Sequence, residues 1–138
     1  MRRTIGLAAL VILSACSQSP EVKLSATCTA VMADPEVQGD IRDANISTAD
    51  YCACAATAFL ALPEGEREEM ITTFETMEQL MQEHDGSAEA AFRELSTAGR
   101  AEDATPEAIA AYESMDALGE RLDDLLDDMR NADRACPV

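Results

Sequence analysis

Apolar side chains recur at alternating intervals of three and four residues along the last part of the chain, and this spacing constrains the fold more than any other feature. The repeat occupies seven positions: Met115, Leu118, Leu122, Leu125, Met129, Ala132 and Cys136. Side chains at this spacing lie on one face of an α-helix, and Asp and Glu fill the outward positions. Thr105 and Pro106 form an N-cap followed by a proline at the first helical position. The pattern therefore predicts one long helix over residues 106–134.

The same kind of spacing predicts four shorter helices, over residues 24–33, 47–62, 64–84 and 87–99. Residues 35–46 are predicted to form a loop, because Gly39 and scattered Asp and Asn residues interrupt any apolar period; a weak turn of helix around Val37 and Ile41 is the alternative. No stretch of the sequence alternates apolar and polar residues for long enough to predict a strand. The sequence therefore predicts an all-α fold, a small helical bundle of four to five helices.

Three of these helices have a clear candidate core face. The helix over residues 47–62 has the inward positions Tyr51, Ala55, Ala58 and Leu62. The helix over residues 64–84 has the stripe Met70, Phe74, Met77, Met81 and His84. The helix over residues 87–99 has the apolar positions Ala88, Ala91, Phe92 and Leu95. Ser47, with Asp50 three residues later, is a variant of the capping box and marks a helix start.

The N-terminal segment has the three regions of an export signal. Arg2 and Arg3 are basic, residues 5–13 are apolar, and small residues precede Cys16. The apolar run is too short to span a bilayer, which is typical of a cleaved signal peptide. A plain secretory signal with an incidental cysteine is the alternative interpretation, and both interpretations predict an exported protein.

The residues Leu13-Ser14-Ala15-Cys16 directly follow the apolar run and resemble the lipobox of bacterial lipoproteins. The resemblance covers only residues 1–17. It implies cleavage before Cys16, with diacylglycerol on the sulfur and an acyl chain such as palmitate on the amine. Several acyl chains on one residue give stable membrane anchoring. Ser17 is not the aspartate that retains lipoproteins at the inner membrane in some bacteria, so the resemblance favours the outer membrane over the inner one.

Domain organisation and charge follow from this interpretation. Residues 1–15 are the predicted signal peptide, residues 16–23 the lipidated cysteine and a polar tether, and residues 24–138 one helical domain in the cell envelope, facing the periplasm. The whole chain has a formal net charge of −17, and removing Arg2 and Arg3 makes it −19. So acidic a protein is not expected to bind nucleic acid. The charge favours basic partners, the alternative being a merely solvated surface.

Four cysteines besides Cys16 indicate two disulfides in an oxidising envelope: Cys28, Cys52, Cys54 and Cys136. Cys52 and Cys54 are two residues apart in a predicted helix, where side chains point to different sides, so a bridge between them would be strained. We therefore expect each of them to pair with a distant cysteine, either Cys28 or Cys136. The loop-entropy model assigns each bridge about 3 to 4 kcal/mol of stability.

Two other sets of residues suggest binding chemistry. Thiols, thioethers and an imidazole could together hold copper or another soft cation. Metal handling is therefore the alternative function. The residues that could bind the metal are Cys52, Cys54, Met77, Met81 and His84. Disulfides and an ordinary methionine core are the simpler interpretation, and we predict no metal site. The last predicted helix carries six closely spaced carboxylates, which suit either a solvated face or a basic protein partner: Asp116, Glu120, Asp123, Asp124, Asp127 and Asp128.

The sequence offers little for catalysis. It contains one histidine, no Gly-x-Ser-x-Gly elbow, no Gly-rich phosphate loop and no histidine pair for zinc. We therefore predict no catalytic residues and no cofactor, with a triad through His84 as the enzymatic alternative. The sequence predicts a membrane-anchored envelope lipoprotein that acts as a binding or adaptor module for a basic envelope protein. A homodimer formed through an outward-facing heptad position is the alternative to a basic partner.

Overall fold

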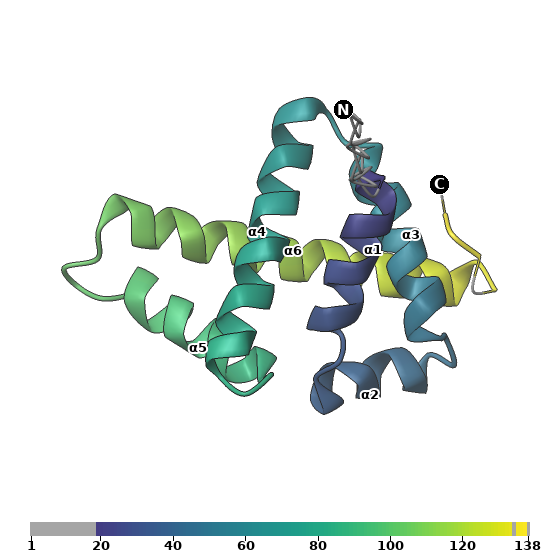
Figure 1. Cartoon of the computed structure of the whole chain (residues 1–138), viewed down its shortest axis with the longest axis horizontal. Helices are drawn as coiled ribbons and strands as arrows, with labels where there is room; N and C mark the ends of the chain where they lie inside the picture. The colour runs from purple at the N-terminus through teal and green to yellow at the C-terminus, as the bar shows by residue number, and fades with distance from the viewer. Residues whose placement is uncertain (1–18, 134, 138) are drawn as a thin grey trace, which may run out of the picture.

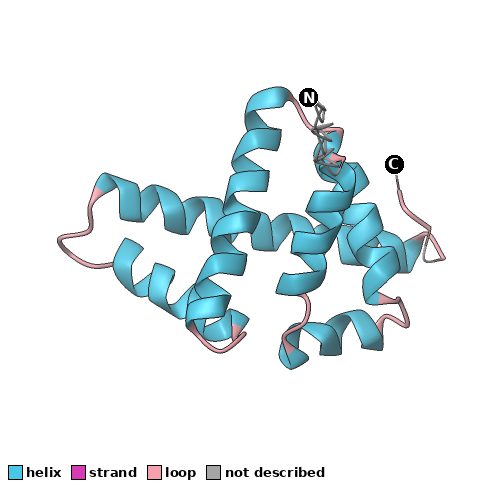
Figure 2. Ribbon diagram, viewed as in Figure 1, coloured by secondary structure: helices cyan, strands magenta, loops and turns pink. Residues whose placement is uncertain are grey.

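The computed structural model describes residues 19–133 and 135–137, and within them the chain forms six α-helices and no strand (Figure 1). The helices are α1 (Pro20–Val31), α2 (Pro35–Asp43), α3 (Thr48–Leu60), α4 (Glu64–Glu83), α5 (Ala88–Gly99) and α6 (Pro106–Asn131). Figure 2 shows short loops between them. The prediction of an all-α bundle is confirmed. The predicted signal peptide, the lipobox, Cys16 and Ser17 lie outside the described residues, as does Arg134, the predicted end of the last helix.

Side-chain caps fix the helix starts that the sequence predicts. The hydroxyl of Ser47 accepts a hydrogen bond from the Asp50 amide at 3.0 Å, which begins α3. The Thr105 hydroxyl accepts one from the Ala108 amide at 3.2 Å, with Pro106 in the first position of α6. Ser87 begins α5 in the same way. Each cap satisfies an amide that has no partner within the helix.

Two segments differ from the sequence prediction. Residues 35–43 form α2 instead of a loop, because Asp34 caps its N-terminus, Pro35 occupies its first position, and Ile41 is buried in the core. One buried residue in nine gives too weak a period to recognise. In addition, α1 begins at Pro20, so residues 20–23, which were predicted as tether, are helical.

The long helix α6 is the platform of the fold. At 26 residues it is about 39 Å long. Figure 1 shows it spanning the width of the molecule, with α4 and α5 toward one end and α1, α2 and α3 toward the other. α5 packs on both α4 and α6, while α1 packs between α3 and α4. Helices at both ends of the molecule therefore pack against α6.

The core contains most of the predicted apolar stripes. Phe74 is fully buried and meets Phe59 of α3 edge to face, with ring centroids 5.7 Å apart. The buried methionines of α4 are Met70, Met77 and Met81, and the buried residues of α6 are Met115, Leu118, Leu125, Leu126 and Met129. Ala132 is exposed, because α6 ends at Asn131, and Cys136 lies beyond the helix.

Two disulfides join distant parts of the chain to α3. Cys28 of α1 bonds to Cys52, and Cys136 of the C-terminal tail bonds to Cys54, with sequence separations of 24 and 82 residues. The expectation that the two neighbouring cysteines bond to different, distant partners is confirmed. Of the two arrangements that the sequence left open, the structure has the one in which α1 attaches to Cys52 and the tail attaches to Cys54, within a single turn of α3.

Candidate functional site

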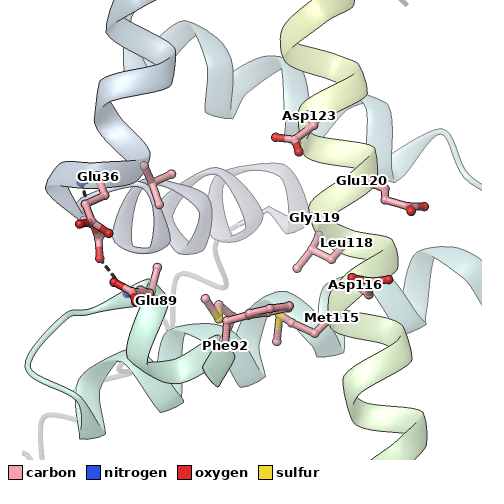
Figure 3. Close-up of a pocket in the computed structure, with 13 residues that line it drawn as sticks. Glu36, Glu89, Phe92, Met115, Asp116, Leu118, Gly119, Glu120 and Asp123 are labelled. Carbon is pink, nitrogen blue, oxygen red and sulfur yellow. Dashed lines mark hydrogen bonds between the residues drawn. The ribbon is translucent and has the colours of Figure 1, made fainter. Parts of the chain in front are cut away.

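An open groove of about 440 Å³ lies where α2, α4, α5 and α6 meet (Figure 3). Its walls come from parts of the chain that are far apart in sequence. α2 contributes Glu36 and Val37, α4 contributes Met77, and residues 115–123 of α6 form the longest wall. The fourth helix, α5, adds Ala88, Glu89 and Phe92. The groove therefore exists only when these four helices have packed together.

The floor of the groove is apolar. It is formed by Val37, Met77, Ala88, Phe92, Met115 and Leu118. Most of these side chains are buried or half-buried, but Phe92 is 37% exposed. Figure 3 shows Phe92, Met115 and Leu118 close together between the two acidic sides of the groove. Methionine side chains are flexible and polarisable, so such a floor can adapt to different apolar groups.

The rim of the groove is acidic on both sides. Glu36 and Glu89 stand on one side, and Asp116, Glu120 and Asp123 stand on the other, where the Glu120 side chain points away from the floor (Figure 3). All five carboxylates belong to exposed residues, and the groove's described lining includes no lysine or arginine. Glu89 also pairs with Arg93 of its own helix. The groove thus combines an apolar floor with a concentrated negative charge, which we call the acidic groove.

Gly119 leaves space in the α6 wall. It is an exposed helical residue that lines the acidic groove, and a Cβ atom built on it would meet no atom within 4 Å. Glycine in a helix interior costs about 1 kcal/mol relative to alanine. The empty position widens the groove at the centre of its acidic wall.

The carboxylate of Asp34 holds one end of the acidic groove together. One of its oxygens accepts a hydrogen bond from the Glu36 amide at 2.8 Å, and the other accepts one from the Ala88 amide at 2.8 Å. Asp34 is 5% exposed; its bond to the Ala88 amide is buried, and its bond to the Glu36 amide is partly buried. A negative charge at two helix N-termini is favourable because both helix dipoles point their positive ends toward it. This residue therefore positions α2 against α5.

Tyr51 of α3 contacts α6 at the other end of the acidic groove, next to Asp123. Its ring is buried, and its hydroxyl donates a hydrogen bond to the Leu122 carbonyl oxygen at 2.8 Å. Burial, together with the nearby negative charge of Asp123, raises the pKa of Tyr51 above its usual value. The phenol is therefore neutral at physiological pH and acts as a fixed hydrogen-bond donor to α6.

The structure separates the residues of the metal-handling alternative. Cys52 and Cys54 are both in disulfides, so neither sulfur is a free thiolate. Met77 and Met81 are buried in the core, and Met77 reaches the floor of the acidic groove. His84 lies at the C-terminal end of α4, where its Nε2 is 2.6 Å from a carboxylate oxygen of Glu94. Within residues 19–133 and 135–137, no three His, Cys, Asp or Glu side chains gather in a metal-binding arrangement.

The carboxylates predicted on the last helix divide into two groups. Asp116, Glu120 and Asp123 line the acidic groove, whereas Asp124, Asp127 and Asp128 are exposed residues that do not. Asp127 forms an ion pair with Arg130 at 2.9 Å. The helical spacing of four and three residues places Asp116, Glu120 and Asp123 along one side of α6, spanning about 10 Å.

Sequence reasoning missed half of the acidic groove. Glu36 belongs to the segment for which the sequence predicts a loop, and Glu89 and Phe92 belong to the helix over residues 87–99, for which the sequence predicts an apolar face and no binding site. One signal for the groove was available in the sequence. The short helix over residues 87–99 has a narrow apolar face made mainly of alanines, and Phe92 lies directly beside that face, where its large ring is not fully buried.

No protein-family model, curated protein or solved structure compared with the chain matches it. Among the helices that the structure describes, none is long and apolar enough to cross a membrane. The chemistry of the acidic groove is therefore the guide to function.

Proposed function

We propose that this chain is a lipid-anchored lipoprotein of the bacterial envelope that acts by binding a basic protein partner, without catalysing a reaction. The observation that carries the proposal is the acidic groove, in which five exposed carboxylates surround an apolar floor. A partner with positive charge and an exposed apolar side chain would satisfy both parts at once. The net charge of −19 on residues 16–138 would attract such a partner from a distance.

The anchor belongs to the proposal through the lipobox resemblance. A domain attached to a membrane through Cys16 would hold the acidic groove close to the membrane surface, since α1 begins only four residues later, at Pro20. The intact mass of the membrane-extracted protein tests this part. We expect a lipidated chain that begins at Cys16, and an unmodified chain beginning at another residue would contradict the anchor.

Photo-crosslinking in the native cells tests the binding function. The photoreactive amino acid benzoyl-phenylalanine replaces Phe92 in the acidic groove, and a matched protein carries it at Ile109, an apolar residue of α6 with nearly the same exposure, 38%, outside the groove. We expect light to join the protein to a basic envelope protein from position 92 and not from position 109. No adduct from position 92, or an adduct with an acidic protein, would contradict the proposal.

The non-catalytic part has its own test. His84 is the only histidine of the chain, and its ring is paired with Glu94 at the surface. We expect a His84→Ala variant to complement a deletion strain fully. Loss of complementation by a variant that is still folded would favour an enzyme.

A further inference from the structure

The shape of the acidic groove limits the kind of basic partner that it can take. Within the part of the chain that the structure describes there is no strand, so no sheet edge borders the groove. An extended peptide gains much of its affinity from main-chain hydrogen bonds to such an edge. The backbone groups of α5 and α6 are already bonded within their helices. A helix satisfies its own backbone, so it can fill the groove without leaving polar backbone groups unpaired.

The spacing of the carboxylates also suits a helix. Asp116, Glu120 and Asp123 follow one another at four and three residues along α6. Lysine or arginine side chains at the same spacing on an incoming helix would stand opposite them. In the described part of the chain, no lysine or arginine forms an ion pair with any of these three carboxylates. They are available to a partner.

The apolar floor of the acidic groove indicates that the incoming helix also has an apolar face. Met77, Met115 and Leu118 form the base, and the exposed ring of Phe92 closes one side. A purely cationic segment would leave this surface in water, whereas a helix with Leu or Phe between its basic residues would cover it. A second copy of this chain does not fit, because its own groove is acidic and two molecules of net charge −19 repel each other.

From these features we infer that the occupant of the acidic groove is a cationic amphipathic helix, which seats a large apolar side chain on the methionine floor beside Gly119 and pairs its basic residues with both rims. This inference rests on the proposed binding function and specifies the partner element. The helix belongs to an envelope protein that presents it as an exposed, basic segment.

A synthetic helix tests the inference with the purified full chain. The probe is a fluorescent peptide of lysine and leucine, with leucines on one face, and its affinity is measured by fluorescence anisotropy in one detergent. The test protein is Asp116→Asn with Glu120→Gln, both in the acidic groove. The matched control is Asp124→Asn with Asp128→Asn, which removes the same charge from the same helix outside the groove. The second probe is the same peptide with two central residues replaced by proline.

We expect the unaltered chain to bind the helical probe saturably. The groove variant should weaken binding roughly fivefold or more and the control variant less than twofold, since exposed charge pairs each contribute modestly. The proline probe should bind at least tenfold more weakly, because proline breaks the helix. Equal weakening by both variants would overturn the inference in favour of a diffuse acidic surface. Equal binding of both probes would overturn the choice of a helix.

Those two results would leave the proposed function intact, since a basic segment still binds. A chain that binds neither probe but crosslinks to a basic protein from position 92 would also overturn only the helix. A chain that binds neither probe and gives no crosslink would overturn the inference and the proposed function together.

Discussion

The buried carboxylate of Asp34 accepts a hydrogen bond from the amide of Ala88, 54 residues later in the chain, at 2.8 Å. The same carboxylate caps its own helix through Glu36. One side chain therefore starts α2 and fixes it against the start of α5, and the two helices supply one rim of the acidic groove.

Replacing Asp34 should destabilise the protein. Asp34→Ala removes a helix cap and a second, charged hydrogen bond, and leaves the Ala88 amide without a protein acceptor, so we expect a loss of about 2 to 4 kcal/mol in the free energy of unfolding. Asp34→Asn keeps one acceptor oxygen and should lose less. Urea unfolding measures both, with exposed Asp124→Ala as the control. A loss below about 0.5 kcal/mol for Asp34→Ala, the usual scatter of surface changes, would contradict this role.

The raised pKa of Tyr51 predicts that the folded protein loses stability in alkali. Its pKa is raised in the folded state, so the unfolded chain releases the phenol proton first, from about pH 10, and folding stability then falls by about 1.4 kcal/mol per pH unit. Tyr51→Phe should be about 1 kcal/mol less stable at pH 7, because it lacks the hydrogen bond to Leu122. At pH 11 the order of the two proteins should reverse. Parallel stability curves for the two proteins between pH 7 and pH 11 would show that Tyr51 does not titrate in this way.

The two disulfides should be reduced in a fixed order. Cys136 is half-buried in the tail, whereas Cys28 and Cys52 are both fully buried. We expect mild reductant to open Cys54–Cys136 first, because thiol exchange needs access to a sulfur. Alkylation followed by mass spectrometry measures the order. Earlier labelling of Cys28 and Cys52 would mean that α1 separates from α3 before the tail is released.

Two glycines should respond oppositely to alanine. A Cβ atom on Gly99 would lie 2.5 Å from the Cβ of Tyr112 and 2.9 Å from the Ala108 carbonyl oxygen, so Gly99→Ala should force α5 and α6 apart and cost about 1 to 3 kcal/mol. Gly119 has open space, so Gly119→Ala should stabilise α6 by up to about 1 kcal/mol. Thermal unfolding compares the two variants. A neutral Gly99→Ala would indicate that the contact between α5 and α6 is loose.

Local sequence signals were sufficient for most of the helices. The caps at Ser47 and Thr105, the helix start at residue 87 and the stripe from Met70 to Met81 are short-range features, and each appears in the structure as predicted. The exclusion of a bridge between Cys52 and Cys54 followed from helix geometry alone. Which of them bonds to Cys28 depends on how α1 packs against α3, and no local pattern contains that information.

The acidic groove could be predicted only in part for the same reason. The carboxylates of α6 were visible in the sequence, but what divides Asp116 and Glu120 from Asp124 and Asp128 is the position of α5, which is set by long-range packing. The role of Asp34 was hidden because its second partner, Ala88, is remote in sequence. The exposure of Phe92 likewise depends on how α2 and α6 pack around α5.

One crosslinking comparison tests the central claim, that a partner occupies the acidic groove, most directly. The photoreactive residue stays at position 92, and the groove is filled by Gly119→Leu; the matched control is Gly65→Leu, since Gly65 is also an exposed helical glycine with nothing within 4 Å of its added Cβ. We predict that the adduct with the basic protein disappears in the Gly119→Leu cells and persists in the Gly65→Leu cells. An undiminished adduct with Gly119→Leu would contradict the claim.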